Sequence, residues 1–138
     1  MPLELSRLQS LRCGPYLASV HVGDIPEIIS AGFGTGFRAV YLSRKYYEKI
    51  VGKHKDLTDY DFLQLPYILK HGLWIGENKE PDCRLVCSPI PDSDQRYKVI
   101  VRKLDNESVL WISTFHKTRP RATRSFLKRG PILRFFTE

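Results

Sequence analysis

The sequence has the length and composition of one globular domain. Its 138 residues are 42% hydrophobic and 27% charged, which excludes collagen-like, coiled-coil and wholly disordered classes and argues against a two-domain enzyme. No apolar run reaches the roughly 20 residues that span a bilayer, and nothing at the N-terminus reads as a signal peptide. We therefore expect one domain over residues 1–138, cytoplasmic and without membrane contact.

Positive charge is concentrated near the C-terminus. The formal net charge is +7, and no acidic residue lies between Glu107 and Glu138, where basic residues recur. A field of this sign attracts polyanions, with nucleic acid as the first candidate and an anionic membrane surface as the second. The alternative is a solvated basic helix without a ligand.

The first half of the chain predicts helices and two short strands. Residues 1–15 are read as either a short helix or an ordered arm, because the leucines there follow mixed spacings. Strands are expected at residues 17–22 and 39–42, where β-favouring side chains lead into a turn or a helix cap.

Two helix start signals follow the second of these strands. Ser43 is the N-cap expected for a helix with apolar residues at helical spacing. A further helix is expected from Thr58 to His71, which Pro66 either tightens or kinks.

From Leu73 onwards the period changes to that of strands. The expected strands cover residues 73–75, 85–87, 97–101, 109–115 and 132–136. The third and fourth of these read as a β-hairpin around Asp105 and Asn106, and residues 121–129 read as a helix. The predicted class is α+β, with N-terminal helices packed on a small, mainly four-stranded antiparallel sheet.

The last strand of the hairpin ends in a group of polar side chains. Thr114 and His116 project to the same side because side chains alternate along a strand, and Lys117 and Arg119 follow at once. An imidazole and a hydroxyl beside fixed positive charge can bind a phosphodiester and move a proton near neutral pH. The alternative is a polar strand end that faces solvent.

A second basic group lies on the predicted C-terminal helix. Arg121, Arg124 and Lys128 share one stripe at helical spacing, which suits phosphate binding without sequence readout. No aromatic platform for stacking bases is obvious among them. This stripe therefore indicates binding and says nothing about catalysis.

A third basic group, Lys53, His54 and Lys55, closes the helix that Ser43 begins. Capping alone could explain it, because cations are favoured at the carbonyl end of a helix. The sharper hypothesis is that His54 and His116 converge, one as base for a ribose 2′-hydroxyl and one as acid for the leaving 5′-oxygen. The helix end suits His54 as the acid, but the order of base and acid stays open.

No pattern in the sequence indicates a metal or a cofactor. The glycines at 32, 34 and 36 lack the lysine of a phosphate-binding loop and the dinucleotide spacing. Cys83 and Cys87 stand four apart without a second pair, which gives zinc little support, and carboxylates do not cluster as a two-metal nuclease requires. We expect phosphoryl chemistry without metal or cofactor.

Five short motifs carry a resemblance to a known group of nucleases. They are Gly23–Pro26, Val40–Ser43, Lys53–His54, Leu65–Leu69 and Ser113–His116. Together with the hairpin, they make the chain from Gly23 to Arg134 resemble the phage- and prophage-associated nucleases of the barnase–EndoU–colicin–RelE-like (BECR) superfamily.

This resemblance implies a metal-independent endoribonuclease that acts as a toxin or effector. The residues on the superfamily's polar motif positions are His54, Thr114 and His116, with Lys53, Lys117 and Arg119 as candidate phosphate ligands. Glu107 lies in a turn, which puts a barnase-type general base in doubt. An arrangement of two histidines and a lysine, similar to EndoU enzymes, is the closer analogy, and Lys117 is counted with the catalytic group.

We therefore expect an endoribonuclease that cleaves transfer or messenger RNA and is neutralised by an acidic antitoxin or immunity protein. One alternative is a non-catalytic nucleic-acid-binding protein that holds phosphates with its C-terminal basic helix. A less favoured alternative is a transferase that uses NAD, with Arg38, Tyr41, Ser113 and Thr114 as ligands.

Overall fold

The structure is a computed structural model. It describes residues 3–15, 18–33, 36, 38–76, 83–89, 95–104, 109–119, 122–135 and 137, with the side chains at 83–85, 87–89 and 122–124 outside the description. No helix among these residues has the length and apolar character needed to cross a bilayer.

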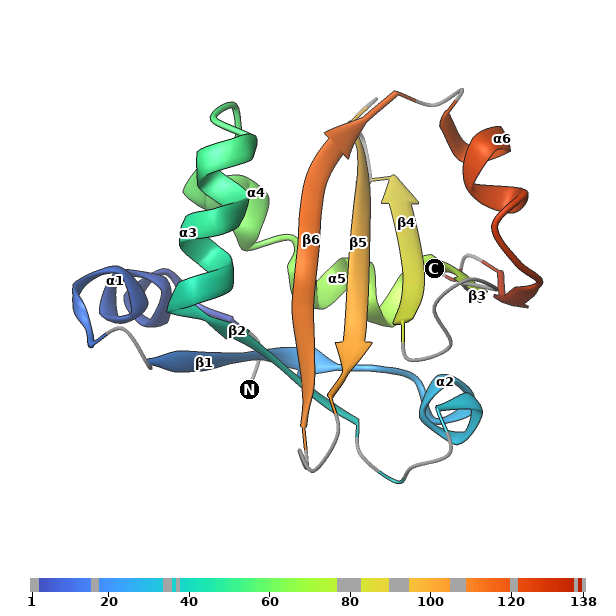
Figure 1. Cartoon of the computed structure of the whole chain (residues 1–138), viewed down its shortest axis with the longest axis horizontal. Helices are drawn as coiled ribbons and strands as arrows, with labels where there is room; N and C mark the ends of the chain where they lie inside the picture. The colour runs from blue at the N-terminus through green and yellow to red at the C-terminus, as the bar shows by residue number, and fades with distance from the viewer. Residues whose placement is uncertain are drawn as a thin grey trace.

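A seven-stranded sheet runs through the described part of the chain (Figure 1). Its strands are β1 (Ser19–Asp24), β2 (Ala39–Ser43), β3 (Leu73–Gly76), β4 (Cys83–Pro89), β5 (Arg96–Lys103), β6 (Leu110–Thr118) and β7 (Ile132–Arg134). They lie in the order β1-β2-β6-β5-β4-β3-β7. Neighbouring strands are antiparallel except β2 and β6, which are parallel.

The α+β class expected from the sequence is confirmed. Strands β3 to β6 form consecutive antiparallel pairs, which is the expected four-stranded sheet. The sheet is larger than expected, however, because β7 adds to β3 and the β1–β2 pair adds to β6. The pairing of β2 with β6 joins segments about seventy residues apart, as in Tyr41 with Trp111, and hydrophobic periodicity cannot reveal such a partner.

The helices lie mostly in the first half of the chain. They are α1 (Leu5–Cys13), α2 (Glu27–Gly32), α3 (Arg44–Lys53), α4 (Asp59–Phe62), α5 (Leu65–His71) and α6 (Ala122–Leu127). Helix α3 begins as expected, with the Ser43 hydroxyl accepting the Tyr46 N–H at 3.1 Å. The helix expected between Thr58 and His71 is instead two helices, α4 and α5. A new helix begins at Leu65 because Pro66 favours the first turn of a helix.

The core fills the space between the sheet and helices α1, α3, α4 and α5. Its largest fully buried side chains are Trp74, Tyr97, Phe62 and Phe115. Phe115 packs on Tyr97 and Phe62, with ring centroids 5.4 and 5.2 Å away. Strand β6 therefore presents one side to a packed core.

A β-bulge in β6 decides which side chains of that strand face the core. Ile100 pairs with Thr114 and Val101 pairs with Ile112, so Ser113 is an extra residue in the ladder. Ile112 and Phe115 are both buried in the core. Thr114 and His116 consequently lie on the opposite side of the strand.

Candidate active site

A cleft between α3 and β6 gathers several of the residues singled out in the sequence. Its volume is about 310 Å³. Its walls are formed by Lys49, Ile50, Lys53 and His54 from the end of α3 and by Ser113, Thr114, Phe115 and His116 from β6. Figure 1 shows α3 lying beside β6, with α6 on the far side of β5 and β4.

The two histidines that were expected to converge are in contact in this cleft. The ring centroids of His54 and His116 lie 4.7 Å apart, with the ring planes tilted by 32°. His54 is the C-cap of α3, where its backbone N–H donates to Ile50 O at 2.9 Å. The end of a helix and the end of a strand thus position the pair from separate elements.

The surroundings of His116 favour a neutral ring. Burial lowers the pKa of His116 below its usual 6.5, and the charges of Lys98 and His54 lower it further, against the hydrogen bond to Lys117 and the charge of Asp56. Its Nδ1 lies 3.0 Å from the carbonyl oxygen of Lys117, which can only accept. The neutral ring therefore carries its hydrogen on Nδ1 and a lone pair on Nε2.

Lys98 is a cation of this site that the sequence analysis missed. It is the register partner of His116 across β5 and β6, which places the two Cβ atoms about 5 Å apart. The side chain is 9% exposed, and its Nζ lies 5.4 Å from the centre of the Phe126 ring. Lys98 is identified by the register of the β5–β6 hairpin, which pairs it with His116.

Three lysines form a stripe along α3, which we call the lysine stripe. Lys45, Lys49 and Lys53 are four residues apart, so they share one face of the helix, and all three are exposed. With the residues that the structure describes, none of them forms an ion pair. Like charges at this spacing destabilise a helix slightly. The sequence analysis named Lys53 alone, although the four-residue spacing was readable.

Lys117 lies on the other side of β6 from the cleft. Its ammonium is 3.5 Å from Asp61 Oδ2, in a side chain that is only 4% exposed. We expected the Lys117 ammonium to lie beside His116. Instead the two side chains lie on opposite faces of β6, because side chains alternate along a strand. The main-chain carbonyl of Lys117, in contrast, holds the His116 ring.

Asp61 is a buried carboxylate whose hydrogen bonds and ion pair link α4 to the sheet. It accepts hydrogen bonds from the Tyr97 hydroxyl and from the backbone N–H and hydroxyl of Thr58, the latter two at 2.7 and 3.0 Å. Burial alone would raise the pKa of Asp61, but these hydrogen bonds and Lys117 outweigh it and lower the pKa below 3.8. We call Asp61, Thr58, Tyr97 and Lys117 the Asp61 network.

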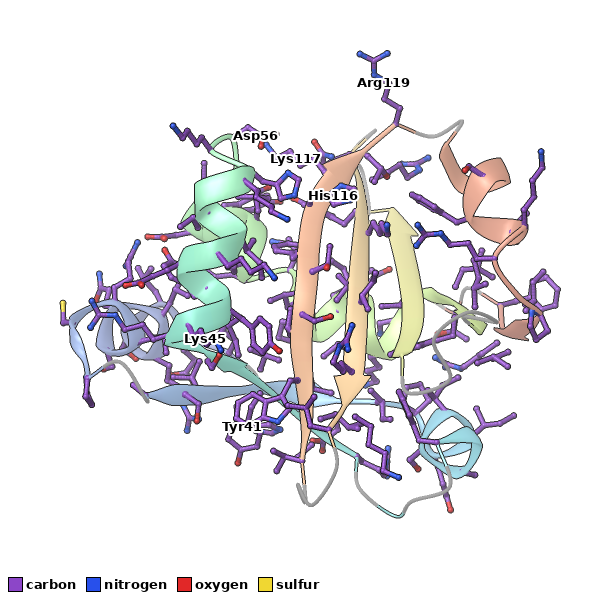
Figure 2. The ribbon with its side chains drawn as sticks, viewed as in Figure 1. Tyr41, Lys45, Asp56, His116, Lys117 and Arg119 are labelled. Atoms are coloured by element: carbon purple, nitrogen blue, oxygen red, sulfur yellow. The ribbon has the colours of Figure 1, made fainter. Side chains whose placement is uncertain are left out.

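The basic C-terminal segment is not brought to the cleft. Arg119 is exposed and points away from α3 into solvent (Figure 2). Arg121 lies outside the described residues, as does the side chain of Arg124. Lys128 is exposed directly after α6, which lies beyond β4 in Figure 1, whereas α3 lies beside β6. Lys49 and Lys53 line the cleft, whereas Arg119 and Lys128 do not.

A second cavity lies where β1, α5 and β7 approach one another. It has a volume of about 520 Å³ and includes His21, Asp24 and Arg38 in its lining. Three of its polar side chains are engaged: His21 Nε2 lies 2.9 Å from Asp24 Oδ1, and Arg38 Nε donates to Ile25 O at 2.9 Å. Of the residues named as ligands for an NAD-using transferase, Arg38 lines this cavity, whereas Ser113 and Thr114 line the cleft.

Within the described ranges, no three His, Cys, Asp or Glu side chains gather as a metal site. The side chains of Cys83 and Cys87 lie outside those ranges. Comparison of the chain with protein-family models, with curated proteins and with solved structures found no match.

Proposed function

We propose that this protein is an endoribonuclease that uses the 2′-hydroxyl of its RNA substrate as the nucleophile. The observation that carries the proposal is the contact between His54 and His116, whose ring centroids lie 4.7 Å apart, in a cleft where Lys49 and Lys53 lie on the same wall as His54. The O2′ that loses a proton attacks the same phosphorus that O5′ leaves as it gains one, so the base and the acid must lie in one site.

His116 is the general base of the proposed reaction. Its ring is neutral near pH 7, and the hydrogen bond from Nδ1 to Lys117 O leaves Nε2 able to accept a proton. As O2′ attacks phosphorus, the hydroxyl proton passes to Nε2. The P–O5′ bond then breaks, and His54 donates a proton to O5′. The products are a 2′,3′-cyclic phosphate and a 5′-hydroxyl.

The cations of the cleft stabilise negative charge on the reacting phosphate and its neighbours. Lys98 lies opposite His116 and supplies fixed charge in a buried setting, where screening by water is weak. Lys49 and Lys53 bind the phosphates that flank the cut. Two histidines and Lys98, rather than Lys117, make up the proposed catalytic group, and no metal is assigned to it.

We further propose that the protein is a cytoplasmic member of the BECR superfamily. The helical first half and the antiparallel strands β3 to β6 have the order that this resemblance implies. As a toxin or effector it would be neutralised by an acidic antitoxin or immunity protein that covers the lysine stripe.

The test is incubation of transfer RNA and of a messenger RNA transcript with the purified protein in excess EDTA. We expect cleavage that leaves cyclic phosphate ends and is lost in His54→Ala and His116→Asn. The matched control is His71→Ala, since that imidazole lies at the end of α5 against Tyr67, away from the cleft. Salt-sensitive RNA binding without cleavage, across a broad RNA panel, would instead favour a non-catalytic binding protein.

A further inference from the structure

Three rings lie side by side across strands β1, β2 and β6. The ring centroids of His21 and Tyr41 are 5.3 Å apart, and those of Tyr41 and Trp111 are 6.2 Å apart. The contacts follow the strand register, in which Tyr41 pairs with both of the others. We call these three residues the ring row.

Tyr41 and Trp111 lie on the same side of the sheet as His116. Their strand neighbours are buried in the core, namely Val40, Leu42, Leu110 and Ile112. Alternation places Tyr41 and Trp111 on the opposite side, where the bulge at Ser113 also places Thr114 and His116. In Figure 2, Tyr41 lies near the lower end of β6 and His116 near the upper end.

The two indoles that the structure describes differ in their hydrogen bonding. The Nε1 of Trp111 is shielded from water and has no hydrogen-bond partner within the described residues. Buried indole N–H groups usually have such a partner. In contrast, the indole of Trp74, which is fully buried, donates to Leu69 O at 3.1 Å.

The lysine stripe connects the ring row to the histidines. Lys45 follows Tyr41 by four residues and lies at the lower end of α3, above Tyr41, in Figure 2. Lysines four residues apart are spaced about 6 Å along a helix axis, so Lys45, Lys49 and Lys53 extend over about 12 Å. This is a regular series of cations that ends at His54.

We propose that Tyr41 and Trp111 stack unpaired bases of the RNA strand whose phosphates follow the lysine stripe to the cleft. Stacking on aromatic rings accepts any base but requires that the base be unpaired. Five residues of strand separate Trp111 from His116, which is about 16 Å. At the stacked spacing of about 3.4 Å per nucleotide, the bound bases lie within about five nucleotides of the cut.

This inference rests on the proposed function for its substrate class, and it makes the enzyme selective for single-stranded RNA. The other explanation for the ring row is that cross-strand aromatic pairs stabilise sheets. That explanation predicts no dependence of RNA binding on a base, whereas stacking predicts one.

The test measures binding of a 2′-O-methyl oligoribonucleotide, which lacks the nucleophilic hydroxyl. Oligonucleotides with one abasic position are compared with the intact strand, with the abasic site moved from one to five nucleotides on either side of the centre. We expect one or two positions at which loss of the base raises Kd about tenfold. This arm uses the unaltered protein, so it does not depend on the folding of a variant.

A second arm uses variants of the protein with the intact oligonucleotide. Tyr41→Leu is expected to raise Kd about tenfold and to remove the effect of the abasic position. Tyr60→Leu is the matched control, because Tyr60 is 61% exposed on α4 and lies outside the ring row. A duplex of the same sequence is expected to bind more weakly than the single strand.

The outcomes separate this inference from the proposed function. RNA cleavage without any base dependence of binding would overturn the ring row as a stacking site and leave the nuclease standing. Base-dependent binding that Tyr41→Leu removes, without cleavage of any RNA, would support the stacking site and overturn the nuclease.

Discussion

His116 and Lys117 are neighbours on β6, yet they lie in opposite environments. His116 lines the cleft beside His54, with a half-buried ring that can still gain or lose a proton. Lys117 faces the interior, where its ammonium lies 3.5 Å from the buried Asp61. One side of the strand collects titratable groups around open space, and the other pairs its charges.

This difference separates groups available for chemistry from groups that stabilise the fold. Buried charges persist when they are paired and hydrogen-bonded, as Asp61 is. The two histidine rings contact each other, and His116 also lies against one backbone carbonyl, with no carboxylate hydrogen-bonded to either ring among the described residues. Changes on the cleft side should therefore alter activity, and changes on the core side should alter stability.

The largest expected effect is on the cleft side. His116→Asn keeps a side-chain donor for the Lys117 carbonyl but removes the base, so we expect single-turnover RNA cleavage to slow by about 10²- to 10⁴-fold. The free energy of unfolding should change by less than about 1 kcal/mol, because the carbonyl keeps a donor and the site lies beside open space. Urea denaturation measures that second quantity, and a variant that loses stability instead of activity would contradict the comparison.

The next effect is on the core side. Asp61→Asn places an amide NH₂ where a carboxylate oxygen now accepts hydrogen bonds, and it removes the partner of Lys117. We expect a loss of about 1–3 kcal/mol in the free energy of unfolding, measured by urea denaturation at pH 7. Cleavage by the folded variant should stay within about threefold of the original if the Asp61 network serves only the fold.

The sign of the pH dependence follows from the lowered pKa of Asp61. A carboxyl with a folded pKa below its unfolded value contributes stability above the unfolded value and loses it as pH falls through the folded one. The stability difference between the original protein and Asp61→Asn should hold above pH 3.8 and shrink at lower pH. A difference that is constant down to pH 2 would show that the Asp61 charge contributes nothing.

A smaller effect is expected for the cations of the cleft. Lys49→Gln with Lys53→Gln should weaken RNA binding and reduce the slope of log K against log salt by about 1.4 for two lost phosphate contacts. The matched double variant is Arg119→Gln with Lys128→Gln, which removes the same charge from exposed positions outside the cleft. Equal slopes for the two double variants would mean that RNA binding depends on the net charge of the protein and not on the cations of the cleft.

The smallest expected effect is a shift in a pH profile. Lys98 lowers the pKa of His116, so Lys98→Met should raise that pKa and move the acidic limb of kcat/KM to higher pH. In the original protein the limb should lie below pH 6.5, since burial already lowers the pKa of His116. NMR titration of the His116 ring checks the direction, with His71 as a ring that should not respond.

Sequence reasoning succeeded where the signal is local. Residues close together in the sequence predict the strands, the Ser43 cap and the end of α3 at His54. The contact between His54 and His116 was a hypothesis about two distant segments, and the structure brings these residues together.

The rest of the candidate site depends on strand register, which a single sequence does not specify. The extra residue at Ser113 decides that His116 faces the cleft and that Lys117 faces Asp61. The pairing of β5 with β6 places Lys98 opposite His116, and the pairing of β2 with β6 joins Tyr41 to Trp111. The basic C-terminal segment had the strongest charge signal in the sequence, but α6 lies beyond β4 and away from α3 in Figure 1.

The most direct test of the central claim is a double-mutant cycle on His54 and His116, measured as single-turnover RNA cleavage in EDTA. A base and an acid that act in one step are strongly non-additive. We predict that His54→Ala with His116→Asn cleaves no more slowly than the slower single variant. Losses that multiply, or single variants that cleave at the original rate, would contradict a paired mechanism.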